Sequence, residues 1–155
     1  SASSQEGKYF TYVYVSTESR EGDTSRTGSD ARQRTAVSRA GLEFVLESER
    51  NAGRQPAEMP QTHEGYDVES RNSSGQVERY IEVKSISAAW GERGVTLTHA
   101  QVKSAQHHKD KFWLYVVEHA DTDEKRLHRI PNPAEVIKSY VYDRGWLKLA
   151  EPQAG

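Results

Sequence analysis

The sequence predicts an α/β fold with a mixed central sheet flanked by helices, and three patterns of apolar residues support this prediction. Apolar residues recur at helical spacing in residues 36–49, and they alternate with polar residues along residues 77–86. Residues 111–119 are largely apolar, which is typical of a central strand covered on both faces. The expected order of helix, strand, strand, helix, strand, strand, helix is that of helices layered on a mixed sheet.

Length and composition narrow the class of protein. The chain has 155 residues, 34% hydrophobic and 28% charged, which suits one domain with a hydrophobic core. It contains no cysteine, so disulfide frameworks, cysteine-based zinc sites and thiol nucleophiles are excluded. No apolar run approaches the roughly 18 residues of a membrane span, and we expect a soluble, cytoplasmic protein with no membrane partner.

The net charge of −2 bears on possible partners. A DNA-binding domain that acts alone usually has a basic surface, because phosphate neutralisation drives its affinity. Either basic groups cluster locally on this chain, or another domain supplies most of the contact with nucleic acid. We expect an N-terminal strand and polar linker in residues 1–30, a folded domain in residues 31–150 and a tail in residues 151–155. The opening Ser1–Ser4 segment suggests a linker end, and hence one domain of a larger protein.

The N-terminal part is expected to contain a strand, a polar linker and a long helix. Residues Tyr9–Val15 are rich in aromatic and β-branched side chains and predict a strand. Residues 16–35 are almost devoid of apolar side chains, which indicates a linker. Ser29 or Asp30 is expected to cap a helix that runs to about Asn51, with the glycine two residues later as its stop.

Residues 66–71 and 77–86 predict a hairpin, because a turn-forming Asn-Ser-Ser-Gly segment separates them. Side chains of the second strand alternate between two faces of the sheet. One face is expected to carry Val77, Arg79, Ile81, Val83 and Ser85. The other face is expected to carry Glu78, Tyr80, Glu82, Lys84 and Ile86.

The C-terminal half predicts a helix, two strands and a final helix. Thr98–Gln101 has the form of a capping box, so a helix is expected to start there and run to His108. Strands follow in residues 111–119 and 126–130. A last helix is expected from Asn132 to about Tyr142, with a proline in its first turn.

Asp67, Glu82 and Lys84 form the constellation that indicates chemistry. Hydrolysis of a phosphodiester uses a hard divalent cation held by oxygen ligands, with positions left for phosphate and water. Asp67 and Glu82 lie on paired strands and can supply two carboxylates to one such metal. Lys84 lies two residues beyond Glu82, about 7 Å along the strand on the same face. Its ammonium is suited to orient the attacking water and to offset charge at phosphorus, so we expect a Mg²⁺ or Mn²⁺ site.

These residues resemble a known signature. Gly65-Tyr66-Asp67 followed by Ile81-Glu82-Val83-Lys84 resembles the Asp…Glu-x-Lys pattern of the PD-(D/E)XK nuclease superfamily. The resemblance implies a restriction-endonuclease-like fold and metal-dependent cleavage of DNA. It also implies catalytic roles for Glu43, which matches the first-helix glutamate of many members, and for Gln101, which matches a glutamine of Mrr-type and RecB-type members. The chain departs from the pattern at Tyr66, where the superfamily name has a proline.

A closer resemblance covers roughly residues 36–137. The sequence from Gly41-Leu42-Glu43 to Ile130-Pro131-Asn132-Pro133 resembles the C-terminal domain of the plant NO VEIN protein. That type of domain also occurs in bacterial proteins, often fused to helicase or other ATPase modules. The resemblance implies a DNA substrate and a fused or associated helicase or ATPase module, within a defence or restriction system. Cleavage of both strands would favour a homodimer.

Four further residues are candidate contacts with nucleic acid. Trp90 and Arg93 belong to a Trp-Gly-Glu-Arg-Gly segment, and these residue types suit base stacking and phosphate contact. His107 and Lys109 lie at the end of the helix predicted after Thr98, where cationic groups suit a phosphate backbone. The alternatives are a flexible surface loop and a solvated helix end that favours cations.

The sequence leaves non-catalytic interpretations open. Asp67, Glu82 and Lys84 are also compatible with weak salt bridges on a half-exposed hairpin. Glu43 is equally compatible with a solvated helix border, and Gln101 with a capping box alone. In that case the fold serves as a non-catalytic module that binds nucleic acid or protein. A third hypothesis is an interaction domain whose N-terminal strand pairs with the sheet edge of a partner.

Overall fold

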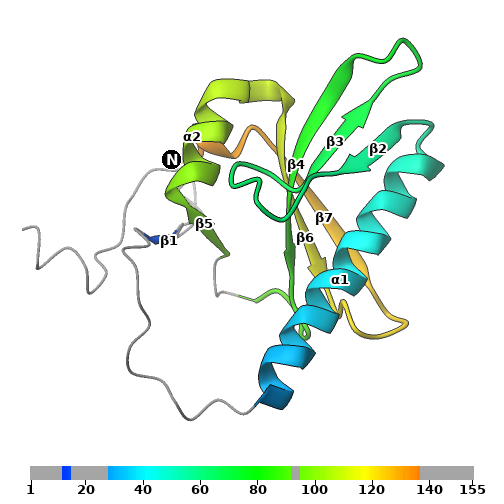
Figure 1. Ribbon diagram of the computed structural model, residues 1–155, viewed down its shortest axis with the longest axis vertical. Helices are drawn as coiled ribbons and strands as arrows, with labels where there is room; N and C mark the ends of the chain where they lie inside the picture. The colour runs from blue at the N-terminus through cyan, green and yellow to red at the C-terminus, as the bar shows by residue number, and fades with distance from the viewer. Residues whose placement is uncertain (1–11, 15–27, 92–94, 137–155) are drawn as a thin grey trace, which may run out of the picture.

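The computed structural model describes residues 12–14, 28–91 and 95–136 (Figure 1). The helices are α1 (Gly28–Asn51) and α2 (His99–His108), with short 3₁₀ turns η1 (Lys109–Lys111) and η2 (Pro133–Glu135). The strands are β1 (Tyr12–Tyr14), β2 (Gln55–Glu58), β3 (Val68–Arg71), β4 (Val77–Ser85), β5 (Thr96–Thr98), β6 (Phe112–Glu118) and β7 (Arg126–Pro131). Neither described helix is long and apolar enough to cross a bilayer.

The predicted α/β fold with a mixed sheet flanked by helices is confirmed. Five strands form one sheet in the order β2-β3-β4-β6-β7, in which β4 and β6 run parallel and every other pair is antiparallel. The predicted apolar strand is β6, and it lies between β4 and β7 as expected for an inner position. A second, two-stranded sheet pairs β1 with β5 in parallel.

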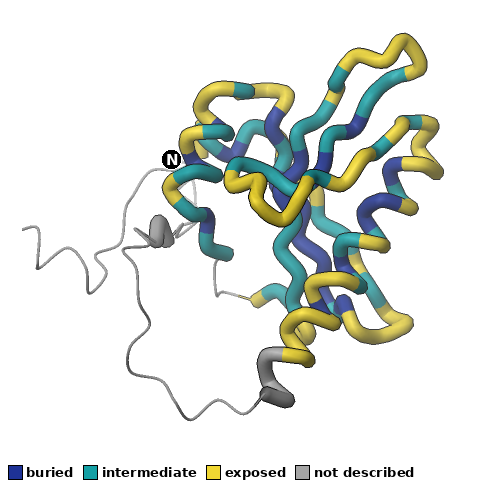
Figure 2. Tube along the Cα trace, in the orientation of Figure 1, coloured by how far each residue is buried: buried dark blue, intermediate teal, exposed yellow. Residues whose placement is uncertain are grey.

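Each face of the central sheet packs on its own hydrophobic core. On one face, Val45 and Leu46 of α1 pack with Ile81 of β4 and Tyr115 of β6. On the other face, the core contains Leu97, Val102, Leu114 and Val116. Because residues along a strand alternate between faces, α1 and α2 cover opposite sides of the sheet. Figure 2 shows the buried residues gathered along the central strands and the inner side of α1.

The α1 helix begins earlier than the sequence prediction. It starts at Gly28, so Ser29 and Asp30 lie within the helix rather than before it, and residues 28–35 are helical rather than linker. The segment after Asp30 is rich in alanine, arginine and glutamine, which are strong helix formers, so the helix extends into solvent beyond its packed part. Its end agrees with the prediction, because Gly53 adopts a φ of 82° just after Asn51.

The α1 helix makes a close approach to β4. A Cβ atom at Gly41 would lie 1.9 Å from the Oγ atom of Ser85 and 2.8 Å from its Cβ atom. Only glycine fits at this distance, so position 41 lets the helix backbone lie directly on the strand. This contact is next to the strand segment that carries Glu82 and Lys84.

Two strands were not predicted. β2 contains Pro56, which lacks a backbone N–H and weakens any strand signal in the sequence. The structure accommodates it because β2 is the edge strand of the central sheet. β5 has only three residues and is held by pairing with β1, a partner that lies more than eighty positions away in the sequence. Such a pairing leaves no local pattern.

The predicted final helix is described only at its start. Asn132 adopts a left-handed φ of 45° and is followed by the three-residue turn η2. Residues 137–142 lie outside the described ranges. The predicted Tyr9–Val15 strand is likewise described only in its middle, as β1.

Candidate metal and catalytic site

The structure brings Asp67, Glu82 and Lys84 together, as the hairpin pattern predicts. Asp67 immediately precedes β3, and its backbone N–H donates to the carbonyl oxygen of Ile81 at 2.9 Å. Its carboxylate Oδ2 accepts from the backbone N–H of Val83 at 2.8 Å. Glu82 and Lys84 project from the same face of β4, with Lys84 Nζ 3.2 Å from Glu82 Oε1. The two acids and the ammonium therefore form one cluster.

Gln101 joins this cluster from the first turn of α2. Its side-chain Oε1 atom accepts from the backbone N–H of Thr98 at 2.8 Å. The backbone N–H of Gln101 donates to Thr98 Oγ1 at 3.2 Å, which completes the capping box. The same side chain donates from Nε2 to Glu82 Oε1 at 2.7 Å and accepts from Lys84 Nζ at 3.1 Å. The helix cap and the site contact are therefore made by one residue at once.

Glu82 is the most deeply buried member of the cluster. The residue is 3% exposed, and its Oε2 atom has no hydrogen-bond partner among the described residues. Burial raises the pKa of Glu82 to about 8; the nearby Lys84 ammonium opposes this shift and the Asp67 carboxylate adds to it. Burial also raises the pKa of Asp67, against the N–H of Val83 and the charge of Lys84.

The arrangement of these two carboxyl groups fits a hard cation. Asp67 and Glu82 face each other closely enough for each to change the other's pKa. Two carboxylates at this range repel unless a proton or a cation lies between them, and the Oε2 atom of Glu82 has no hydrogen-bond partner among the described residues. Mg²⁺ commonly binds proteins through one or two carboxylates and keeps several waters. Within the described ranges no group of three or more His, Cys, Asp or Glu side chains could hold a metal, so the fit is to a water-rich site rather than to an all-protein cage.

Glu43 lies apart from the cluster. Its side chain is 63% exposed and pairs with Arg39 one helical turn earlier, at 3.0 Å. Arg39 also binds Glu58 of β2 at 2.7 Å. These contacts correspond to the solvated helix border that the sequence left open, and the predicted catalytic role of Glu43 remains a prediction.

A shallow cavity of about 210 Å³ leads to Asp67 from the α1 side. Arg39 and Leu42 of α1 form one wall, and Met59 and His63 of the segment before β3 form the other. Asp67 lines this cavity, whereas Glu82, Lys84 and Gln101 do not.

One family of known proteins matches the segment of the chain that contains the whole cluster. A family model described as Protein NO VEIN, C-terminal, matches residues 37–130. The chain belongs to this NO VEIN C-terminal family. No curated protein and no solved structure matched the chain. The matched segment of the NO VEIN C-terminal domain contains Asp67, Glu82, Lys84 and Gln101.

The predicted nucleic-acid contacts have different positions in the NO VEIN C-terminal domain. Trp90 is half-buried, packs against the α2-side core and donates its backbone N–H to Glu118 Oε1 at 2.9 Å. Arg93 lies outside the described residues. His107 and Lys109 are exposed at the C-terminal end of α2. They remain candidate phosphate contacts, whereas Trp90 has a packing role.

Two groups of residues were missed by the sequence analysis. Glu49 on α1 is completely buried and binds Arg54, Ser70 and Tyr115. Its spacing of four from buried Val45 could have indicated this, since i and i+4 share a helix face. The second group is a row of aromatic and imidazole rings in contact with one another around Tyr80. Strand alternation had already placed Tyr80 itself on the same face as Glu82.

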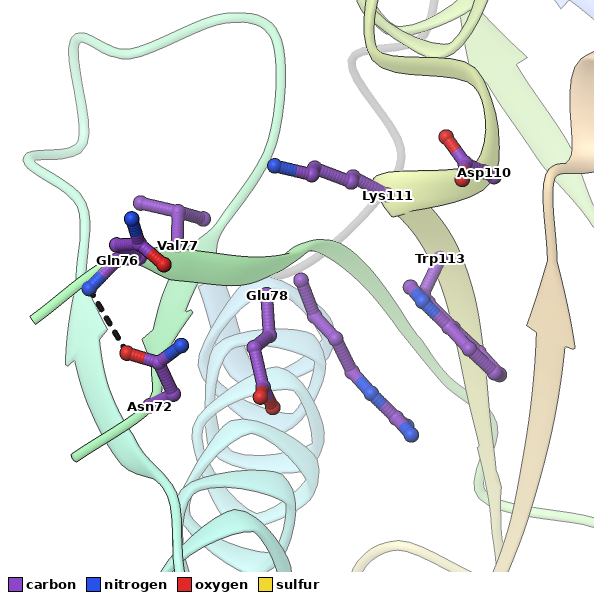
Figure 3. Close-up of a pocket in the computed structure, with 8 residues that line it drawn as sticks. Asn72, Gln76, Val77, Glu78, Asp110, Lys111 and Trp113 are labelled. Atoms are coloured by element: carbon purple, nitrogen blue, oxygen red, sulfur yellow. Dashed lines mark hydrogen bonds between the residues drawn. The ribbon is translucent and has the colours of Figure 1, made fainter. Parts of the chain in front are cut away.

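A second hollow of about 380 Å³ lies at the end of the sheet where β4 and β6 begin (Figure 3). Its charged lining has mixed signs, with Glu78 and Asp110 beside Arg79 and Lys111. The guanidinium of Arg79 lies 3.9 Å from the ring centroid of Trp113. None of the clustered acids lines this hollow, so it is separate from the candidate site.

Proposed function

We propose that this NO VEIN C-terminal domain is a Mg²⁺- or Mn²⁺-dependent DNA endonuclease of the PD-(D/E)XK type. The observation that carries the proposal is the buried Glu82 carboxylate, which faces Asp67 with one oxygen unpaired and lies beside the ammonium of Lys84. A buried acid with a strongly raised pKa and a specific charge partner is a mark of functional sites. The order and strand context of these residues also match the superfamily pattern.

Each residue has a distinct task in this proposal. Asp67 and Glu82 would hold the metal, which when bound polarises the phosphodiester and lowers the pKa of its water. Lys84 is oriented by Glu82 and Gln101, and from there it donates to the attacking water or to a phosphate oxygen. Gln101 acts as a positioning residue because it fixes both Glu82 and Lys84 to the start of α2.

The proposal extends to the setting of the domain. The chain has a net charge of −2, so a partner with a basic DNA-binding surface would supply most of the affinity for DNA. We propose a fused or associated helicase or ATPase module for that role, in a defence or restriction system. Two copies of the domain would cut both strands of a duplex.

Cleavage of DNA with defined variants tests the proposal. Supercoiled and single-stranded circular DNA are incubated with the protein in Mg²⁺, Mn²⁺ or Ca²⁺. We expect nicking or linearisation with Mg²⁺ or Mn²⁺, and loss of activity of about 100-fold or more in Lys84→Ala and Glu82→Gln, as for groups that act on the transition state. Glu78→Gln on the same strand and Lys103→Ala on α2, both exposed, are matched controls and should retain activity. Equal inertness of the wild type and all variants under every metal would refute catalysis.

One observation favours a second candidate, a non-catalytic nucleic-acid- or protein-binding module. Lys84 is already paired with both Glu82 and Gln101, which is compatible with a closed structural cluster. Calorimetric titration with Mg²⁺ and Mn²⁺ separates the two candidates. Binding that disappears in Asp67→Asn supports the metal site, whereas absence of binding in the wild type favours the module.

A further inference from the structure

A row of aromatic and imidazole rings extends from the candidate site across three parts of the fold. The ring of Tyr80 on β4 stacks on His108 at the end of α2, with centroids 3.7 Å apart and planes inclined by 21°. Tyr66 meets Tyr80 edge-on at 5.0 Å and His108 at 5.8 Å. His63 continues the row at 4.2 Å from Tyr66, and His107 at 4.8 Å from His108.

The ring row begins next to the carboxylates of Asp67 and Glu82. Tyr66 is the neighbour of Asp67 in the chain, and Tyr80 lies two residues before Glu82 on the same face of β4. That spacing places the two β4 residues about 7 Å apart along the strand. The α2 helix carries Gln101 in its first turn and His108 in its last turn, so the helix connects the site to the ring row. The row therefore lies within reach of a nucleotide adjacent to a phosphate bound at Asp67 and Glu82.

These rings are not part of either hydrophobic core. Tyr66, Tyr80 and His108 are half-buried, and His63 and His107 are exposed. Part of the row is therefore in contact with solvent. Aromatic side chains presented in this way are the usual means by which proteins stack nucleobases without reading their sequence.

The charges around the row suit a polyanion. Lys109 and Lys111 are exposed beside His108, with the exposed Asp110 between them, so this turn carries a net positive charge. The acid in contact with the row is Glu69, which accepts from the Tyr66 hydroxyl at 2.7 Å. Arg71 binds the other oxygen of Glu69 at 2.6 Å, so the charge of this acid is offset. Rings flanked by lysines are the combination found in grooves for single-stranded nucleic acid.

We propose that Tyr66, Tyr80 and His108 form a stacking platform for unpaired bases next to the cleaved phosphate, so that the preferred substrate is single-stranded or locally melted DNA. In a duplex the faces of the bases are covered by their neighbours, and a base can stack on protein rings only after it leaves that arrangement. That the adjoining phosphate is the one cleaved rests on the proposed nuclease function. The proposed binding of unpaired DNA is independent of that function.

The test measures binding without cleavage. Fluorescence anisotropy of labelled oligothymidylate and of a duplex of equal length is recorded with the intact protein in Ca²⁺. We expect tighter binding of the single strand, and an affinity for it about tenfold or more weaker in Tyr80→Leu, as for the loss of a stacked base. Tyr80→Phe keeps the ring and should bind as the wild type does. Trp113→Leu removes a half-buried ring from the opposite face and is the matched control.

A second measurement covers the case in which Tyr80→Leu does not fold, as judged by circular dichroism. An oligonucleotide with a fluorescent base analogue whose emission is quenched by stacking is titrated with the wild type. Quenching by the protein is expected, and its absence would overturn the platform. Equal or tighter binding of duplex, no binding of either DNA, or unchanged single-strand binding by folded Tyr80→Leu would each overturn it as well. A protein that binds single strands through Tyr80 but never cleaves them would refute only the nuclease function.

Discussion

Glu49 and Glu82 are both buried glutamates, and they lie on opposite faces of the same sheet. Glu49 is 0% exposed and Glu82 is 3% exposed, so burial does not distinguish them. The difference is in their partners. Both oxygens of Glu49 accept hydrogen bonds, from Arg54, from Ser70 Oγ at 2.8 Å and from the Tyr115 hydroxyl at 2.7 Å. One oxygen of Glu82 has no such partner among the described residues.

The pKa values of the two acids shift in opposite directions for this reason. Burial alone acts to raise the pKa of Glu49, but the hydrogen bonds from Arg54, Tyr115 and Ser70 outweigh it, and the pKa lies below its ordinary value. Glu82 lacks an equivalent set of donors, and its pKa rises to about 8. A fully paired buried carboxylate stabilises the fold, whereas one with an unpaired oxygen retains the capacity to bind a proton or a cation. The comparison thus separates a structural acid from a candidate functional one.

The largest effect on stability is expected from Glu49→Ala. The substitution leaves Ser70 and Tyr115 without their acceptor and leaves Arg54 unpaired, and breaking a buried pair costs about 3 to 5 kcal/mol in the free energy of unfolding. Urea denaturation measures this loss. Metal binding by the remaining folded protein should be unchanged, and a specific loss of metal affinity would contradict the separation of the two acids.

The second effect is a pH dependence that Glu82 imposes. Its pKa is raised from 4.5 to about 8 in the folded protein, so the folded state keeps a proton that the unfolded chain releases. Stability therefore falls as pH rises within that window, by about 3 kcal/mol between roughly pH 5.5 and 7.5. Thermal unfolding of wild type and Glu82→Gln across this range measures it.

Glu82→Gln removes the titrating group, so its stability curve should be flatter, and saturating Mg²⁺ should reduce the fall in the wild type by binding the ionised pair. Identical curves for wild type and variant would contradict the raised pKa. Glu49 gives the opposite sign, because the stability it contributes is present above pH 4.5 and is lost as the pH falls through its lowered pKa.

A third, intermediate effect is expected at the contact between α1 and β4. Gly41→Ala would place a Cβ atom 1.9 Å from Ser85 Oγ, and such overpacking costs about 1 to 3 kcal/mol. The gain of about 1 kcal/mol in helix propensity from glycine to alanine does not offset it fully. A double-mutant cycle with Ser85→Gly checks the cause, since the second change removes the obstructing side chain. Additive losses would show that the contact is not responsible.

The smallest effect is expected at the exposed Arg39–Glu43 pair. Both side chains are at least half exposed, so solvent screens their attraction and the pair contributes little to stability. Glu43→Gln should leave stability and Mg²⁺ affinity close to those of the wild type in the same urea and calorimetric measurements. A tenfold loss of Mg²⁺ affinity would instead group Glu43 with Glu82 and confirm its predicted role.

The candidate cluster was accessible from the sequence because its geometry is local. Strand alternation fixes Glu82 and Lys84 on one face, the hairpin turn brings Asp67 opposite them, and the capping box fixes Gln101 at the start of its helix. Each of these rules acts over a few residues. The helix that starts after Thr98 and the strands around residues 77–86 and 111–119 were confirmed for the same reason.

Features that depend on how elements pack were not accessible. The rotation of α1 on the sheet decides that Glu49 is buried while Glu43 is solvated, and both lie near apolar positions in the sequence. β2 is a strand despite Pro56 because the sheet offers it an edge. The stacking of Tyr80 on His108 joins a strand to the far end of a helix, and no local pattern specifies that contact.

The position of Thr98 has a consequence for communication within the domain. Thr98 pairs with Tyr14 in the β1–β5 sheet, and its N–H is bound by the side chain of Gln101. A single residue thus separates the N-terminal strand from the amide that contacts Glu82 and Lys84. A displacement of β1 would therefore reach Gln101, and through it Glu82 and Lys84, across one peptide unit.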